Sequence, residues 1–106
     1  MGALEPVVAI AHWKTDAASA VAVLALVAEL RQRSLEEPGC LAYEVLRSVA
    51  TSDVIVLLER YADAAALEAH RSSQHYRELL VERILPLLSE RRIDLLRPLE
   101  APARSS

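Results

Sequence analysis

The Pro38-Gly39 pair is the feature that most constrains this chain of 106 residues, because it separates a helical pattern from a strand pattern. Before it, from about residue 16 to 36, apolar residues recur at helical spacing, and Thr15 or Asp16 is placed to cap the helix. Proline cannot continue that helix and glycine tolerates a left-handed turn, so we expect the helix to stop here. After the pair, residues 41–49 alternate as a strand does.

The other segments extend this pattern to the order β-α-β-β-α-β. Residues 7–13 form an apolar, β-branched run, and the short turn at 50–53 predicts a hairpin with the strand that begins at 54 and ends at Tyr61. Asp63 is placed to cap a short helix that runs to His70, and a further helical segment starts near residue 74. Pro86 should break that segment, before a last strand at 93–99.

This order predicts an α+β protein with the ferredoxin-like, split β-α-β-β-α-β fold and an antiparallel sheet. We expect one domain over residues 1–106, with its core at about 7–99 and a flexible tail at 100–106. Two helices cover only one face of such a sheet. We assign to the uncovered face six apolar residues: Ala9, Ala11, Trp13, Ile55, Leu57 and Leu96. An uncovered apolar face predicts a homodimer in which two sheets pack together as a barrel.

Composition excludes several classes of partner. The net charge is −3 and the twelve Lys and Arg residues are mostly interleaved with Glu, so we expect no nucleic-acid binding. The single Cys40 forms no disulfide within the chain, which fits a reducing compartment. The longest apolar run is too short to cross a membrane, and no secretory signal is visible. We therefore expect a cytoplasmic protein with no membrane partner.

The sequence lacks the common motifs of cofactor and metal binding. With only two glycines it has no glycine-rich phosphate loop. His70 and His75 are five residues apart, or roughly 140° around a helix at 3.6 residues per turn, and no thiolate or carboxylate is seen to complete a ligand set. We expect neither a metal nor an organic cofactor.

The candidate catalytic residues are the three histidines. His75 is our first choice as a base because it lies near a helix N-terminus, and His12 and His70 follow. His12 neighbours Trp13, so if Trp13 faces the dimer interface, His12 faces the helices. The candidate substrate-binding residues are Tyr76, Tyr61, Tyr43 and Glu59. Each residue also has a structural interpretation, namely helix capping, core packing or cross-strand pairing.

Three segments together resemble a known family. They are Glu37 to Ser48 (EPGCLAYEVLRS), Glu59 to Asp63 (ERYAD) and Ala66 to Tyr76 (ALEAHRSSQHY). Over about residues 7–99 the chain resembles the antibiotic biosynthesis monooxygenase (ABM) family of small dimeric ferredoxin-like proteins. The resemblance implies one of several chemistries: oxidation of anthrones or quinols with O2 alone, haem degradation, or processing of small signalling molecules without oxygenation.

The residues at the family's motif positions narrow this choice. The Ser-x-His-Tyr/Phe motif falls on His75, which supports that residue as the base. The haem-degrading branch uses a first-strand asparagine and an axial histidine, and the corresponding positions hold His12 and Leu79-Leu80. Haem degradation is therefore disfavoured. Anthrone oxidisers use a tryptophan in the pocket, whereas Trp13 is expected to face away from it.

Two hypotheses remain for the function. The first is a monooxygenase without metal or flavin that uses O2 and a histidine base on a planar, apolar, anthrone-like or quinol-like substrate. The second is a non-oxygenating small-molecule binding protein or isomerase of the same fold. A large pocket lined by aromatic residues would favour the first hypothesis, and a small polar pocket or a filled core would favour the second.

Overall fold

The computed structural model describes residues 5–99, and these confirm the predicted order of elements. The predicted flexible tail at 100–106 lies outside the described residues. The elements are β1 (Val7–Lys14), α1 (Ala17–Ser34), β2 (Cys40–Arg47), β3 (Val54–Tyr61), α2 (Ala64–Arg71), the π-helix η2 (Tyr76–Ile84), the 3-10 helix η3 (Leu85–Leu87) and β4 (Glu90–Leu96). Within residues 5–99, no helix is both long and apolar enough to cross a membrane.

Both α-helices begin at an aspartate: α1 at Asp16, one of the two predicted caps, and α2 at the predicted Asp63. The side chain of Asp16 accepts a hydrogen bond from the backbone N–H of Ser19, and Asp63 accepts one from Ala66, each at 2.8 Å. These bonds satisfy N–H groups that the first turn of a helix leaves without partners. Pro86 lies in the short 3-10 helix that follows the π-helix, so the predicted break is present.

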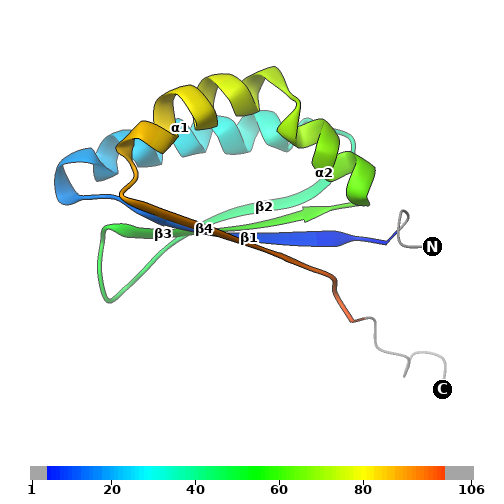
Figure 1. The fold of residues 1–106 in the computed structure, drawn as a ribbon, viewed down its shortest axis with the longest axis horizontal. Helices are drawn as coiled ribbons and strands as arrows, with labels where there is room; N and C mark the ends of the chain where they lie inside the picture. Colours follow the sequence, from blue (N-terminus) through cyan, green and yellow to red (C-terminus); the bar gives the residue numbers. More distant parts are fainter. Residues whose placement is uncertain (1–4, 100–106) are drawn as a thin grey trace.

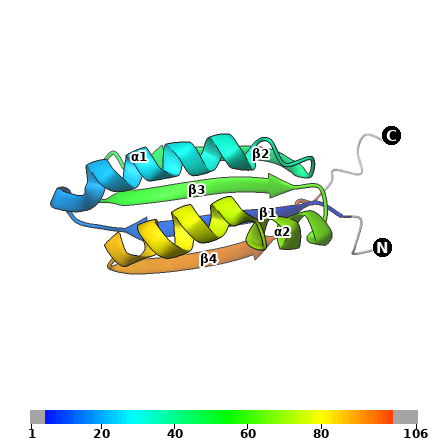
Figure 2. The ribbon, with the colours of Figure 1, turned by 90° about the horizontal axis from the view of Figure 1, so that it is seen from above.

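The four strands form one antiparallel sheet in the order β2-β3-β1-β4, and the helices lie on one side of it (Figures 1 and 2). The last strand differs from the prediction because its limits are set by pairing with β1. Glu90 pairs with Lys14 and Leu96 pairs with Val8. β4 therefore covers 90–96 instead of 93–99.

The assignment of sheet faces from the sequence was wrong for five of its six residues. Ala9, Ala11, Trp13, Ile55 and Leu57 are buried beneath the helices, with exposed fractions of 5% or less. Only Leu96, which pairs with Val8, lies on the strand alternation that faces away from the helices. We call that side the open face; its apolar residues include Val8, Ile10, Leu46, Val56, Leu58 and Leu96. Both alternations of β1 and β3 are apolar, so their pattern alone does not distinguish the two sides.

Gly39 has a structural role other than the one predicted. Its φ is not positive, so the chain does not need glycine here for a left-handed turn. A Cβ atom at this position would instead lie 2.4 Å from the Cβ of Ala66, in α2. The backbone carbonyl of Gly39 also accepts a hydrogen bond from the N–H of Ala62 at 2.9 Å. Gly39 thus allows the start of β2 to approach α2 closely.

Gly39→Ala should destabilise the protein by about 1–3 kcal/mol, because the new methyl group overlaps Ala66. The free energy of unfolding is measured by urea denaturation of the wild type, Gly39→Ala, Ala66→Gly and the double variant. The double-mutant cycle should show that Ala66→Gly recovers part of the loss. Additive effects of the two changes would contradict a steric clash between these positions.

Candidate functional site

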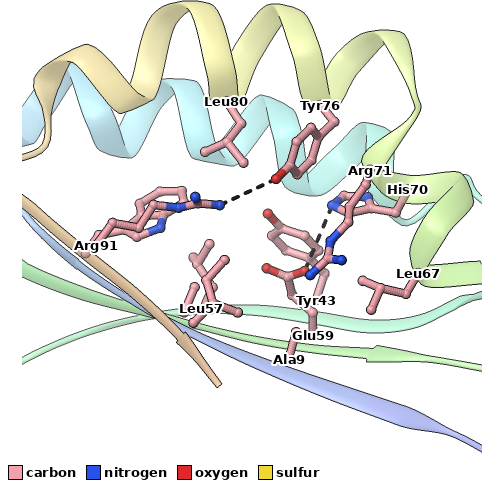
Figure 3. Close-up of a pocket in the computed structure, with 13 residues that line it drawn as sticks. Ala9, Tyr43, Leu57, Glu59, Leu67, His70, Arg71, Tyr76, Leu80 and Arg91 are labelled. Atoms are coloured by element: carbon pink, nitrogen blue, oxygen red, sulfur yellow. Dashed lines mark hydrogen bonds and ion pairs between the residues drawn. The ribbon is translucent and has the colours of Figure 1, made fainter. Parts of the chain in front are cut away.

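A cavity lies between the helix-facing side of the sheet and the segment formed by α2 and η2 (Figure 3). Its volume is about 30 Å³. Its lining is apolar on the sheet and around the helices, with a few polar groups between. The lining residues are Ala9, Ala11, Trp13, Tyr43, Leu57, Glu59, Leu67, His70, Arg71, Tyr76, Leu80, Arg91 and Ile93.

Glu59 and His70 are a buried carboxyl group and a buried imidazole of this cavity, with exposed fractions of 8% and 3%. Glu59 comes from β3 and His70 from the last turn of α2, so the two approach one another from the sheet and from the helices. The Nε2 atom of His70 is 3.9 Å from Oε1 of Glu59. Their side chains point toward one another across the cavity in Figure 3.

Burial raises the pKa of Glu59 above its ordinary value. Three neighbours oppose this effect and lower the pKa of Glu59: a hydrogen bond from Tyr61, and the nearby His70 and Arg91. The Tyr61 hydroxyl donates to Oε1 of Glu59 at 2.6 Å. A hydrogen-bonded carboxyl group of raised pKa beside a histidine is an arrangement suited to holding or moving a proton.

The neighbouring phenols and the thiol stay protonated at neutral pH. Burial, followed by the charge of Glu59, raises the pKa of Tyr43 and of Tyr61 well above the ordinary value. Burial and the nearby Glu37 raise the pKa of Cys40 to about 11. The tyrosines are therefore hydrogen-bond donors rather than bases, and Cys40 is not a thiolate nucleophile.

His70 is enclosed by aromatic rings. The centroids of Tyr61 and Tyr76 are each 5.2 Å from its ring, and the Tyr76 contact is edge-to-face. Tyr43 lies at 6.2 Å. On the side away from the cavity, Nδ1 of His70 is 2.9 Å from Oε2 of Glu37. The ring therefore lies between a carboxylate behind it and the cavity in front.

Trp13 lines the cavity, contrary to the expectation that it faces a dimer interface. It is 2% exposed, and its indole N–H is buried with no hydrogen-bond acceptor among residues 5–99. Arg91, its partner in the β1–β4 pairing, donates a hydrogen bond to the Tyr76 hydroxyl at 3.4 Å. Arg71 and Arg91 are exposed residues of the cavity lining. The cavity thus contains more hydrogen-bond donors than acceptors.

The structure separates the three candidate histidines. His70 lines the cavity, whereas His75 lies behind it, with Nε2 2.5 Å from Oε2 of Glu37 and a ring centroid 6.1 Å from that of His70. His12 alternates with the buried Ala11 and Trp13, so it points to the open face instead of the helices, where it borders a second groove. The expected orientation of His12 was wrong because it assumed that Trp13 faces the dimer interface.

Of the four candidate substrate-binding residues, Tyr43, Glu59 and Tyr76 line the cavity. Tyr61 is fully buried and contacts it through Glu59. Sequence reasoning missed Glu37, Arg71 and Arg91. In the sequence, Glu37 is only the residue before Pro38 in a turn, and nothing local indicates a role in a site. Arg91 reaches the cavity because β4 pairs with β1, and a local sequence pattern does not show that pairing.

Contrary to the sequence analysis, a carboxylate does accompany His70 and His75. One donor atom from each of Glu37, His70 and His75 lies within 4.8 Å of the others. Nitrogen and oxygen ligands at 2.0–2.1 Å from a tetrahedral ion are about 3.3 Å apart. The observed N···O separations of 2.5 and 2.9 Å are those of direct hydrogen bonds, so these side chains fit a hydrogen-bonded cluster better than a metal centre.

The raised pKa of Glu59 should make stability depend on pH. Between the unfolded-state pKa, about 4.3, and the raised native value, the folded state binds more protons, so stability falls as pH rises through this window. Glu59→Gln removes this decline. Urea denaturation at a series of pH values should therefore show the variant gaining stability relative to wild type as pH rises. Glu68→Gln, at an exposed helix position, is the control; parallel curves for wild type and Glu59→Gln would contradict the assignment.

Comparison with known proteins agrees with this fold. The Mycobacterium tuberculosis protein named "Putative monooxygenase Rv0793" is 35% identical over 71 residues, which cover 67% of this chain and 69% of that protein. Its solved structure has a TM-score of 0.83 with 30% identity and covers 92% of this chain and 98% of that one. The structure of PA3566 from Pseudomonas aeruginosa has a TM-score of 0.83 and 28% identity, covering 91% and 96% of the two chains.

The family model described as "Antibiotic biosynthesis monooxygenase" matches residues 6–80. That range includes most of the cavity lining, from Ala9 on β1 to Leu80 on η2. With the sheet order, the cavity and these relatives in agreement, the chain belongs to the antibiotic biosynthesis monooxygenase family.

Proposed function

We propose that this protein is a monooxygenase that oxidises a planar, electron-rich, quinol-like or anthrone-like substrate with O2, using a histidine to remove the substrate's proton. The observation that carries the proposal is the meeting of one buried histidine, His70, with a set of hydrogen-bond donors in a largely apolar cavity. Membership of the family and the monooxygenase name of the M. tuberculosis relative support the same class of reaction.

In this proposal His70 is the base. Its Nε2 atom faces the cavity carboxyl group of Glu59, and its Nδ1 atom contacts Glu37. His75 and His12, our other candidates from the sequence, do not line the cavity. Proton removal turns the substrate into an anion that is a stronger electron donor than the neutral molecule. An apolar lining excludes water from that anion.

The donors of the cavity stabilise this anion. Tyr76 and Arg91 are joined by a hydrogen bond at the rim, and the indole N–H of Trp13 has no acceptor among the described residues. A substrate oxygen that accepts from these groups would satisfy a buried donor and place the developing charge beside a guanidinium. Glu59, held by Tyr61, is the carboxyl group that accepts or returns a proton nearby.

The reaction balances with O2 as the only oxidant. The substrate C–H or O–H proton goes to His70 Nε2, and the substrate anion transfers one electron to O2. The resulting radical pair combines to form a C–O bond, and the peroxide takes up a proton. Cleavage of its O–O bond, with loss of the second oxygen as water, leaves a new carbonyl group. The net change at an anthrone-like methylene is CH2 + O2 to C=O + H2O.

The cavity volume favours a small substrate. At about 30 Å³ the cavity holds little more than a water-sized molecule, so even a single-ring quinol requires the rim to open. Arg71, Arg91 and Ile93 are the exposed lining residues, so in this proposal the rim opens by movement of their side chains toward solvent. A single-ring quinol needs a smaller movement than a three-ring anthrone.

The small volume of the cavity, about 30 Å³, favours a second candidate function, a non-oxygenating isomerase or small-molecule binding protein, over oxidation of a large aromatic substrate. A base opposite donors to an oxyanion also suits enolisation of a small carbonyl compound. The two functions differ in the consumption of O2.

Oxygen uptake by metal-free and flavin-free protein, measured with a panel of hydroquinones and anthrones, tests the proposal. Protein-dependent uptake is expected, and His70→Gln should lower it by roughly 10²–10⁴-fold, the usual contribution of a general base. Tyr76→Phe should lower it less, since Arg91 remains. His12→Gln, the matched control on the open face, should retain activity. Uptake no faster than the spontaneous rate across the panel would instead favour the isomerase or binding function.

The proposal includes a homodimer formed through the open face. The helices leave this side of the sheet uncovered (Figure 1), and its central residues Ile10, Val56 and Leu58 are apolar. Leu46 and Leu96 are 46% and 48% exposed on the same side. Packing two such faces together would remove this apolar surface from water.

Light scattering at micromolar concentration should give the mass of two chains. Val56→Asp places a charge at the centre of the open face and should yield monomers. Val21→Asp is the matched control, since Val21 is 77% exposed on α1, and this variant should remain dimeric. A monomeric wild-type protein would refute the assembly.

A further inference from the structure

Behind the cavity, Glu37, His70 and His75 form a hydrogen-bonded group that we call the Glu37 cluster. Both histidines contact the same carboxylate oxygen, Oε2, at 2.9 Å from His70 Nδ1 and 2.5 Å from His75 Nε2. The three side chains come from different segments: the turn after α1, the end of α2, and the start of η2. Their exposed fractions are 15%, 3% and 16%, respectively.

The hydrogen-bonding capacities of these groups restrict where the protons lie. An ionised carboxylate only accepts, so each contacting ring nitrogen must carry a hydrogen. For neutral His70 this selects the tautomer with hydrogen on Nδ1, which leaves the lone pair on Nε2. Nε2 is the atom that lies 3.9 Å from Glu59, at the cavity. The cluster thus directs the basic nitrogen of His70 toward the position of a substrate.

The second carboxylate oxygen indicates that stability alone does not account for this arrangement. Oε1 of Glu37 is buried and has no hydrogen-bond partner among residues 5–99, while Oε2 accepts twice. A buried acceptor without a partner is unfavourable. Both histidines share one oxygen, so the carboxylate does not bridge them with separate oxygens.

We propose that Glu37 is a positioning residue that holds His70 in the Nδ1–H tautomer, with Nε2 as the proton acceptor, and that His75 holds Glu37 in place by donating to the same oxygen. When Nε2 takes a proton, the imidazolium lies against the Glu37 carboxylate, which stabilises the charge. The catalytic role of this geometry rests on the proposed function, because that function takes His70 as the base. The tautomer of His70 does not depend on the proposed function.

The tautomer is measured on the full-length protein labelled with 15N in histidine, by long-range 1H–15N correlation spectra of the imidazole rings in the presence of a chelator. At a pH where the rings are neutral, wild-type His70 should be Nδ1–H. In Glu37→Gln the side-chain amide competes as a donor, and the Nε2–H form of His70 should become substantially populated. His75→Gln is the conservative variant: its amide N–H replaces the donor to Glu37, so His70 should stay Nδ1–H. His12, on the open face, is the internal control and should not change.

The outcomes separate this inference from the proposed function. The positioning role of Glu37 would be overturned if wild-type His70 had the Nε2–H form, or if Glu37→Gln left the tautomer of His70 unchanged. A stoichiometric metal ion, found by elemental analysis before the chelator is added, would also overturn it. If Glu37→Gln does not fold, the tautomer of His70 in the wild type and in His75→Gln tests the positioning role of Glu37. Once a substrate is known, Glu37→Gln should lower kcat by roughly 10-fold or more at similar KM, as part of the loss expected for a general base. A wild type that shows the Nδ1–H form but no oxygen uptake would retain the inference and reject the oxygenase.

Discussion

The packing of all the helices against one side of the sheet is the constraint on which the rest of the structure depends. It places the alternation that contains Ala9, Ala11 and Trp13 under α1 and η2 and leaves the other alternation of β1 uncovered. Because Ala9 and Ala11 are small, the sheet leaves a space beneath the helices beside Trp13. The cavity therefore results from packing of the helices on the side of the sheet that contains Ala9 and Ala11.

Within the cavity, the surroundings are of low polarity, so the protonation state of each ionisable group depends on its neighbours. Glu59 is buried with a raised pKa and is held by Tyr61, while Tyr43 and Tyr61 are kept as neutral phenols. His70 lies between this carboxyl group and that of Glu37. A proton that reaches this region therefore has a small number of well-defined positions.

Local patterns were sufficient for much of the fold. Asp63 caps α2 as predicted, and Asp16 caps α1 as one of the two predicted residues, because capping depends mainly on neighbours in sequence. The order of elements and the ferredoxin-like class followed from the same signals. The candidate site was predicted in part: His70, Tyr43, Glu59 and Tyr76 line the cavity. Glu37, Arg71, Arg91 and the orientation of Trp13 were missed, since each depends on contacts between distant segments.

Sequence by itself determined which segments become helices and strands, because caps, turns and the spacing of apolar residues act over a few residues. It did not determine which of two apolar alternations faces the helices, since either side of β1 and β3 has hydrophobic residues to bury. Only the tertiary structure decided that, through packing of the largest side chains into one core. That decision moved Trp13 into the cavity and His12 out to the open face, and it brought the carboxylate of Glu37 against two histidines more than thirty residues away.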